Sequence, residues 1–197
     1  YTGRSPLEAV SMSIDMEPDD VAFRCNLVTL SDAANYADRI MLDYSSDEIG
    51  SDEAARLIEV INKAFANDEL RFYPGKSYRH CLIWKHGLKN MNLVPPHDIL
   101  TRRIGDYLPS GEGASLLLQM MEKSITFLPE HPVNKARVKR QLRPASSIWI
   151  WGQGTKPQLP DLAATYQLKG SVISAVDLIQ GLGICAGLRV VEVPGAT

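Results

Sequence analysis

Residues 21–30, VAFRCNLVTL, set the first limit on the fold, because a run rich in β-formers with a single charge, Arg24, predicts a strand. MLDYS, residues 41–45, predicts a second and shorter strand. LRFYPG and YRHCLIWK, separated by a Pro-Gly turn, predict a β-hairpin. SSIWIWGQG predicts a further strand that is closed by a glycine turn. The chain is therefore expected to build a sheet.

Helix signals lie before and between these strands. Ser5, with Pro6 next to it and Glu8 three residues later, forms a capping-box pattern that predicts a short helix over residues 6–14. Ser51 is expected to cap a second helix, SDEAARLIEVINKAFAND, whose apolar residues recur at helical spacing. ASLLLQMMEKSITF predicts a strongly apolar helix, whereas residues 88–109 are expected to be loop-rich.

The last part of the chain, SVISAVDLIQGLGICAGLRVVEV, follows a strand–helix–strand order that normally gives adjacent parallel strands. Gly181, Gly183 and Gly187 match the dinucleotide fingerprint only loosely, so they are expected to serve close packing and a helix stop. The final strand is expected to enter a turn at PGAT, and the polypeptide to continue beyond both ends of the chain. The predicted fold class is α/β, with α+β as the alternative: a mixed sheet with flanking helices.

Composition excludes several classes of protein. With 197 residues, 45% hydrophobic and 22% charged, the chain is long enough to bury a core. A net charge of -2 argues against nucleic acid as a partner. No apolar run approaches the about 18–20 residues that span a bilayer, so no membrane is expected. Cys25, Cys81 and Cys185 lack C-x-x-C spacing and predict buried thiols in a reducing compartment, the cytoplasm.

Tyr78, Arg79 and His80 form the first candidate site, on the second arm of the predicted hairpin. Alternation along a strand puts Arg79 on the face opposite Tyr78 and His80, so one side can reach a ligand while the other packs. The arginine fork matches phosphate or carboxylate, and histidine can donate to the same group. The alternative is a strand with one solvated charge and a half-buried aromatic pair.

The second candidate is His97 with Asp98, which two prolines present on a stiffened loop. Asp98 could orient His97 or raise its pKa, although it could equally cap a turn. Gln153 lies in GQG at the carboxyl end of a predicted strand, where α/β proteins receive ligands.

A basic run provides a third candidate, with two interpretations. It would form either an anion site for a phosphorylated metabolite or the polar face of a helix. Its members are Lys135, Arg137, Lys139, Arg140 and Arg143. The four histidines show no i, i+4 pairing and no aspartate cluster resembles a two-metal site, so this chain is not expected to bind a catalytic metal by itself.

Several strings together carry a family resemblance along nearly the whole chain: YTGRSPLEA, PDDVAFRCNLVTL, RFYPGKSYRHCLIW, VPPHDI, SSIWIWGQG and LKGSVISAVDLIQGLG with AGLRVVEVPGAT. They resemble the archaeal-type, cofactor-independent phosphoglycerate mutases of the alkaline phosphatase superfamily. A related bacterial branch is proposed to contain homoserine kinases. One departure is VKRQLRPAS, which lacks the glycine expected before the proline-alanine motif.

The resemblance implies a two-part enzyme. A phosphatase-like core would hold two divalent metals (Mn, Mg or Zn) and a serine that becomes phosphorylated, and an inserted domain would grip the substrate. Family members carry the metal ligands and the serine outside the matching stretch, so the serine is expected upstream of Tyr1. This chain is then expected to hold no catalytic residue and no cofactor. Residues 1–165 would form the inserted domain with the segment that leads into it, and residues 166–197 a returning segment of the core.

The resemblance also implies which residues contact the substrate. The candidates are Arg24, Arg79, His80, His97 and Asp98, with Gln153 and Lys169 as secondary ones. The implied reaction interconverts 3-phosphoglycerate and 2-phosphoglycerate through a phosphoserine in the full-length protein, and the isolated piece is expected to be inactive. Homoserine kinase-like transfer and a non-catalytic phosphometabolite-binding module are the alternatives. The expected partners are a small phosphorylated metabolite and the remainder of the polypeptide.

Overall fold

The main sheet is built around β1 (Val21–Leu30), as the sequence predicts. The structure is a computed structural model, and it describes residues 3–191 and 193. β4 (Arg79–Trp84) pairs with β1 and then with β3 (Leu70–Tyr73), while β7 (Ser147–Thr155) pairs with β1 as well. β2 (Met41–Asp43) joins the last residues of β1. Every pair in this sheet is antiparallel, so the mixed fold is confirmed in its α+β form.

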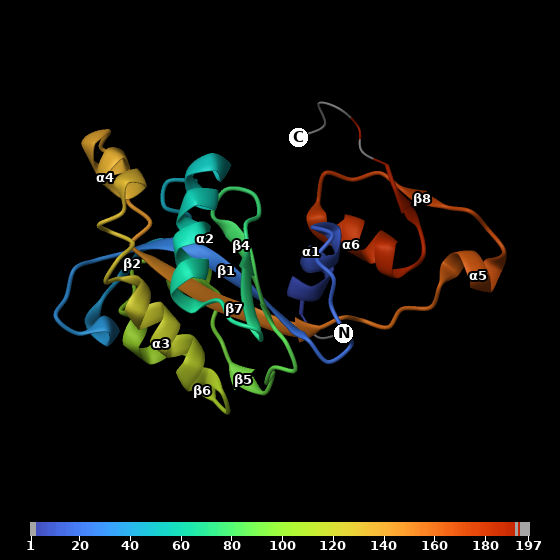
Figure 1. Cartoon of the computed structure of the whole chain (residues 1–197), viewed down its shortest axis with the longest axis horizontal. Coiled ribbons are helices and arrows are strands. Elements are labelled where there is room, and N and C mark those ends of the chain that lie inside the picture. Colours follow the sequence, from blue (N-terminus) through green and yellow to red (C-terminus); the bar gives the residue numbers. More distant parts are fainter. Residues whose placement is uncertain (1–2, 192, 194–197) are drawn as a thin grey trace.

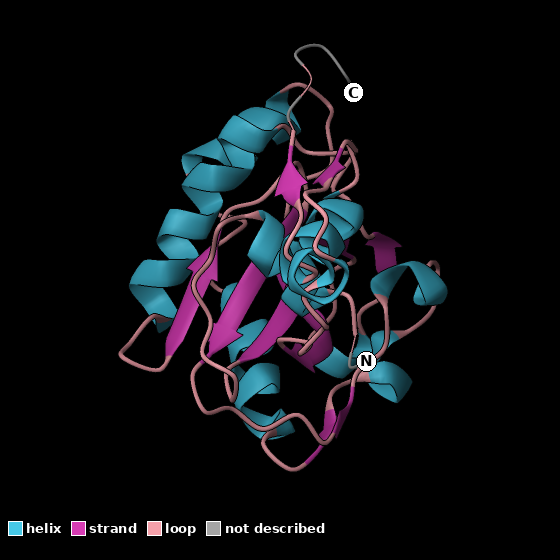
Figure 2. Ribbon diagram, turned by 90° about the vertical axis from the view of Figure 1, so that its right-hand side faces the viewer, coloured by secondary structure: helices cyan, strands magenta, loops and turns pink. Residues whose placement is uncertain are grey.

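Helices cover both faces of the sheet (Figure 2). α2 (Ser51–Phe65) and α3 (Ala114–Ser124) pack their apolar sides on the face that carries Phe23, Cys25 and Leu27, which is the larger core. The intervening residues of β1 point the other way, and Ala22 packs there with Ala9 of α1 (Ser5–Ser11). The alternation along β1 therefore gives the sheet one face that is covered by α2 and α3 and another face on which α1 packs.

Short elements connect the larger ones, in line with the predicted loop-rich stretch. β5 (Met91–Asn92) pairs with β6 (Ser110–Gly111). Two 3-10 turns, Pro96–Ile99 and Ile104–Tyr107, lie in this stretch. A third turn, Tyr36–Asp38, lies between β1 and β2, and the short helix α4 (Pro132–Lys139) lies between α3 and β7.

The predicted strand–helix–strand unit is confirmed at the end of the described chain. After α5 (Leu162–Tyr166), β8 (Ser171–Val172) and β9 (Arg189–Val190) form a parallel pair around α6 (Asp177–Cys185). The turn expected at PGAT lies outside the described residues. No helix in the described part of the chain is long and apolar enough to cross a membrane.

α6 packs directly against α1, away from α2, α3 and α4 (Figure 1). Gly181 makes this contact possible, because a Cβ at that position would collide with the carbonyl oxygen of Leu7. Gly183 faces Val172 in the same manner, and Gly187 follows the end of α6 with a φ of +76°. The predicted roles of these three glycines in close packing and a helix stop are confirmed.

Three local predictions are wrong because tertiary contacts take up the groups involved. Ser5 lies inside α1 and does not cap it, since its hydroxyl donates to the carbonyl of Gly152. Gly50, rather than Ser51, is the N-cap of α2, and the Ser51 Oγ accepts from the Ser77 amide. The glycine turn expected after SSIWIW is also absent, because β7 continues to Thr155 with Gly152 at a bulge.

Candidate functional site

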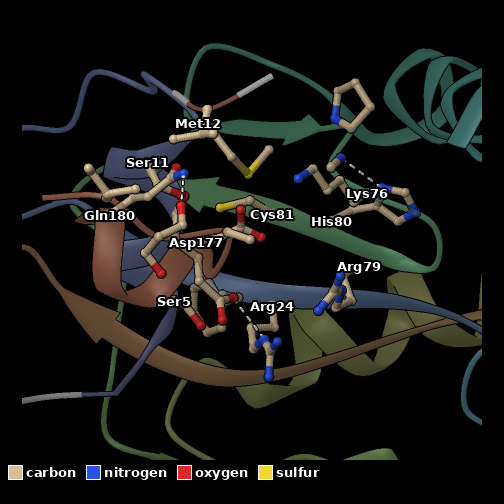
Figure 3. A pocket seen from close by; sticks show the side chains of 18 of the residues that line it. Ser5, Ser11, Met12, Arg24, Lys76, Arg79, His80, Cys81, Asp177 and Gln180 are labelled. Carbon is tan, nitrogen blue, oxygen red and sulfur yellow. Dashed lines mark hydrogen bonds and ion pairs between the residues drawn. The ribbon is translucent and has the colours of Figure 1, made fainter. Parts of the chain in front are cut away.

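A cavity of about 620 Å³ lies between the sheet and the α1–α6 pair (Figure 3). Strands β1 and β4 with the loop between β3 and β4 form one wall, and α1, α6 and residues 173–175 face it. The sheet wall carries Arg24, Lys76 and Arg79, whereas the helix wall carries Glu8 and Asp177. The lining is therefore divided by charge, with cations on the sheet and carboxylates on the helices.

Arg24 is held on two sides. Its Nε lies 2.9 Å from the Glu8 Oε2, and its Cζ lies 4.6 Å from the ring centroid of Trp151. Burial lowers the pKa of Arg24 and raises the pKa of Glu8, while the attraction between the two charges opposes both shifts. The ion pair offsets the cost of burying each charge, which keeps a cation at the edge of the cavity.

Arg79 lies on the same face of the sheet as Arg24. Arg24 is paired with Cys81 across the ladder, and Arg79 is two residues along β4, so the two arginines are diagonal neighbours (Figure 3). Arg79 is exposed, with its Cζ 5.7 Å from the Tyr78 ring, and no described carboxylate lies within ion-pair distance of it. Its charge adds to the lowering of the pKa of Arg24. An anion bound between the two guanidinium groups would relieve this repulsion.

His80 borders the cavity but has a different environment. It is paired with Cys25, so its ring is turned to the opposite face of β4 from Arg79, which confirms the predicted alternation. The Nδ1 accepts a hydrogen bond from the Gly75 amide at 3.1 Å, while the buried Nε2 has no described partner. Burial lowers its pKa to about 3, so the imidazole is neutral at pH 7. Its contact with a substrate stays a prediction.

His97 and Asp98 lie outside the cavity on the Pro96–Ile99 turn. Their side chains approach to 3.7 Å between Nε2 and Oδ1, as an exposed pair. The His97 ring lies 5.4 Å from that of Trp151, which also contacts the Arg24 guanidinium. One indole thus connects the second candidate site with the first.

Gln153 and Lys169 do not border the cavity. The Gln153 Nε2 donates to the carbonyl of Met91 at 2.6 Å, so this amide ties β7 to β5. Lys169 is exposed in the segment before β8. Their roles in binding stay predictions that the geometry of the cavity does not favour.

Four of the five residues of the basic run make ion pairs within the chain, which favours the interpretation of the run as a structural feature. Arg137 is 2% exposed and pairs with Glu53 at 2.6 Å, and Arg140 pairs with the same carboxylate. The remaining pairs are Lys135 with Glu130 and Arg143 with Asp43 and Asp47.

One group of metal-ligating side chains occurs away from the cavity. Asp19, Asp20 and His86 bring their ligand atoms within 4.8 Å of one another, although Asp19 and His86 are exposed. The histidine is far from the two aspartates in sequence, so counting residue spacings did not find this group.

Sequence reasoning also missed four residues of the site: Glu8, Lys76, Trp151 and Asp177. Glu8 was visible only as part of a helix-start pattern. The strand pattern explained Trp151, and Lys76 and Asp177 belong to no motif. Their proximity to Arg24 and Arg79 depends on chain segments that are far apart in sequence.

The fold and the cavity define a class: α+β proteins with an arginine-bearing sheet face opposed by a helix pair. The family model of 2,3-bisphosphoglycerate-independent phosphoglycerate mutase matches residues 1–134. The chain belongs to this family, which confirms the predicted resemblance.

Relatives and solved structures agree with this assignment. A probable 2,3-bisphosphoglycerate-independent phosphoglycerate mutase of Geobacter sulfurreducens is 47% identical over the whole chain, and one of Methanothrix thermoacetophila is 48% identical. The chain spans only 49% and 48% of their lengths. A cofactor-independent phosphoglycerate mutase from Thermoplasma acidophilum has the same fold, with a TM-score of 0.66 at 24% identity over 99% of this chain and 53% of that one. A Pyrococcus horikoshii protein shares the fold with a TM-score of 0.72 at 24% identity, and the match covers 100% of this chain and 44% of that one.

Proposed function

We propose that this chain is the substrate-binding part of a phosphoglycerate mutase, which interconverts 3-phosphoglycerate and 2-phosphoglycerate through a phosphoserine in the full-length protein. The observation that carries the proposal is the pair Arg24 and Arg79, adjacent on one face of the sheet at the edge of the cavity. Membership of the family supports the same conclusion. The full-length enzyme is proposed to act in the cytoplasm, within glycolysis.

The chemistry of the substrate matches the sheet wall. Phosphoglycerate carries a phosphate and a carboxylate, and guanidinium groups bind both through paired N–H donors. Lys76 adds a third positive charge to the same wall. Phosphoryl transfer depends mainly on positioning and on neutralising charge, so binding residues of this kind contribute directly to its rate.

The phosphorylated serine and the two divalent metals are assigned to the remainder of the polypeptide. Metals would neutralise the transferring phosphoryl group when bound. Among the residues that the structure describes, groups of three metal ligands occur only at Asp19, Asp20 and His86, which do not border the cavity. The residues of the cavity therefore do not fit a two-metal site, and their proposed task is to bind and orient the substrate.

Phosphorylation of homoserine is the second candidate, because the helix wall offers carboxylates. Glu8 and Asp177 could accept an ammonium group from an amino-acid substrate whose anionic end lies on the arginines.

A coupled mutase assay on the full-length parent with Mn²⁺ or Mg²⁺ separates these functions. We expect turnover of 3-phosphoglycerate. Inertness toward it together with phosphorylation of homoserine would support the second candidate. Binding of phosphoglycerate without turnover of either compound would leave a binding module and contradict the proposed activity.

A further inference from the structure

We propose that Glu8 is a positioning residue: its carboxylate fixes the guanidinium of Arg24 against Trp151, so that the terminal nitrogens of Arg24 are presented to the anionic group of the ligand. The inference deepens the proposed function and rests on it for the identity of that ligand. Glu8 itself is not proposed to touch the reacting atoms.

The contacts of Arg24 divide its donors into two sets. The Nε lies 2.9 Å from the Glu8 Oε2 in an ion pair, and the guanidinium carbon lies over the Trp151 ring, 4.6 Å from its centroid. Neither terminal nitrogen, Nη1 or Nη2, donates a hydrogen bond to any described residue, and the ion pair with Glu8 is made through Nε. These nitrogens carry four of the five N–H donors of an arginine. The part of Arg24 that can grip a phosphate or carboxylate in two places is thus left available.

Glu8 is itself well placed to act as a fixed support. It lies on α1, which the Ser5 hydroxyl ties to the Gly152 carbonyl of β7, and which packs closely on α6 at Gly181. The Glu8 side chain is 18% exposed. A carboxylate on an anchored helix holds its partner more accurately than one on a loop would. An arginine held in this way loses less side-chain freedom when a ligand binds.

Competition between Glu8 and the ligand for Arg24 is the opposing possibility. The carboxylate contacts the Nε edge, whereas a ligand would use the terminal nitrogens, so the two anions need not displace each other. Other charges near Glu8 act on it in both directions: Asp177 repels the carboxylate, whereas Arg4 and Arg79 attract it. Two substitutions distinguish positioning from competition. Glu8→Gln keeps the length of the side chain but removes the charge of the ion pair, whereas Glu8→Ala removes both.

The test uses the full-length parent and measures the Kd of 3-phosphoglycerate and of inorganic phosphate by calorimetry, together with KM and kcat. We expect Glu8→Ala to raise Kd and KM about tenfold, as the loss of one partly buried ion pair would, with a smaller effect on kcat. We expect Glu8→Gln to stay within about threefold of the wild type, because a side chain of the same length still fills the space beside the Arg24 Nε although the ion pair is lost. Tighter binding by both variants would establish competition and overturn the proposal. Equal weakening by both, or no change in either, would overturn it as well.

Glu53→Ala is a matched control, because Glu53 is 20% exposed, pairs with arginines and lies outside the cavity. It should lower the melting temperature without changing Kd. A similar rise in Kd for Glu53→Ala and Glu8→Ala would reduce the effect to general destabilisation and contradict the proposal. If Glu8→Ala fails to fold, Glu8→Asp serves in its place, because it withdraws the carboxylate from Arg24 by one methylene. We expect Glu8→Asp to raise Kd less than the loss of the whole side chain would. An unchanged Kd for Glu8→Asp would contradict the proposal. If phosphate binding shows the expected pattern but phosphoglycerate is neither bound nor turned over, only the proposed function fails.

Discussion

The guanidinium carbon of Arg24 lies 4.6 Å from the centroid of the Trp151 ring, in a cation–π contact that joins β1 to β7. The same indole contacts His97, which lies outside the cavity, at 5.4 Å between the ring centroids. Its Nε1 donates to the Asn26 Oδ1 at 3.0 Å, and the Asn26 amide donates in turn to the Tyr44 carbonyl. Arg24 therefore rests on a side chain whose own position is fixed by a buried polar contact.

We expect Trp151→Phe to reduce the free energy of unfolding by about 1–3 kcal/mol, because it leaves the buried Asn26 Oδ1 without its donor. The phenyl ring keeps an aromatic face under Arg24, so the affinity for 3-phosphoglycerate should fall much less than stability does. Urea unfolding and calorimetry on the full-length parent measure the two effects. Trp84→Phe is the control, since the Trp84 indole nitrogen has no hydrogen bond among the described residues. Equal losses of stability in both variants would contradict the role of the Asn26 contact.

Arg79→Ala should raise KM for phosphoglycerate with little loss of stability. Arg79 is exposed and pairs with no described carboxylate, so folding gains little from it, and exposed substitutions usually change stability by less than about 0.5 kcal/mol. Arg71→Ala is a closely matched control, because Arg71 is also exposed, lies on the neighbouring strand and stacks on Tyr73 at 5.6 Å without bordering the cavity. A large loss of stability with unchanged kinetics for Arg79→Ala would return this residue to a structural role.

Local patterns in the sequence predicted those features that depend on neighbouring residues. The opposite placement of Arg79 and His80 follows from the pleat of a single strand, and the helix stop at Gly187 follows from one backbone angle. The same reasoning could not separate an anion site from an internal ion pair at Arg137. Its partner, Glu53, lies on a helix far away in sequence, and nothing in the basic run indicates it.

The site itself depends on such distant contacts. Glu8 reaches Arg24 only because α1 packs against the sheet beside α6, and no spacing in the sequence encodes that arrangement. Gln153 shows the same dependence on distant partners, and its role in binding stays a prediction. A strand end suggested a ligand-binding residue, but the amide is taken up by the Met91 carbonyl. Side-chain partners, rather than secondary structure, are what the sequence left undetermined.

His80 is expected to make stability depend on pH. An exposed imidazole of the unfolded chain takes up a proton near pH 6.5, whereas the buried ring does so only at about pH 3. Between these values the unfolded chain binds more protons, so the free energy of unfolding should fall as the pH falls from 6.5, by at most about 1.4 kcal/mol per pH unit. Urea unfolding of the wild type and of His80→Leu measures this contribution. The measurements run from about pH 4 to pH 7, where the protonation of the unfolded chain changes. The variant should show a shallower slope.

His86 provides a control of opposite sign. The carboxylate of Asp19 raises the pKa of His86, so its contribution to stability is present at low pH and is lost as the pH rises through that raised value. In His86→Ala the free energy of unfolding should therefore fall at least as steeply below pH 6.5 as it does in the wild type. Identical slopes for the wild type and His80→Leu would show that the buried imidazole does not carry the effect.

Gly181→Ala tests the joint between α1 and α6. Helix propensity alone predicts that alanine stabilises a helix interior by about 1 kcal/mol relative to glycine. The added Cβ would instead collide with the backbone carbonyl of Leu7, which cannot move aside by rotating a side chain, so we expect a net loss of about 1–3 kcal/mol. Thermal unfolding of the full-length parent measures the sign. Gly50→Ser is the control, because nothing lies within 4 Å of a Cβ at that N-cap position and serine is a good capping residue there. The melting temperature of Gly50→Ser should be unchanged or higher than that of the wild type. A higher melting temperature for Gly181→Ala would contradict the close packing of α1 on α6, the two helices that form one wall of the cavity.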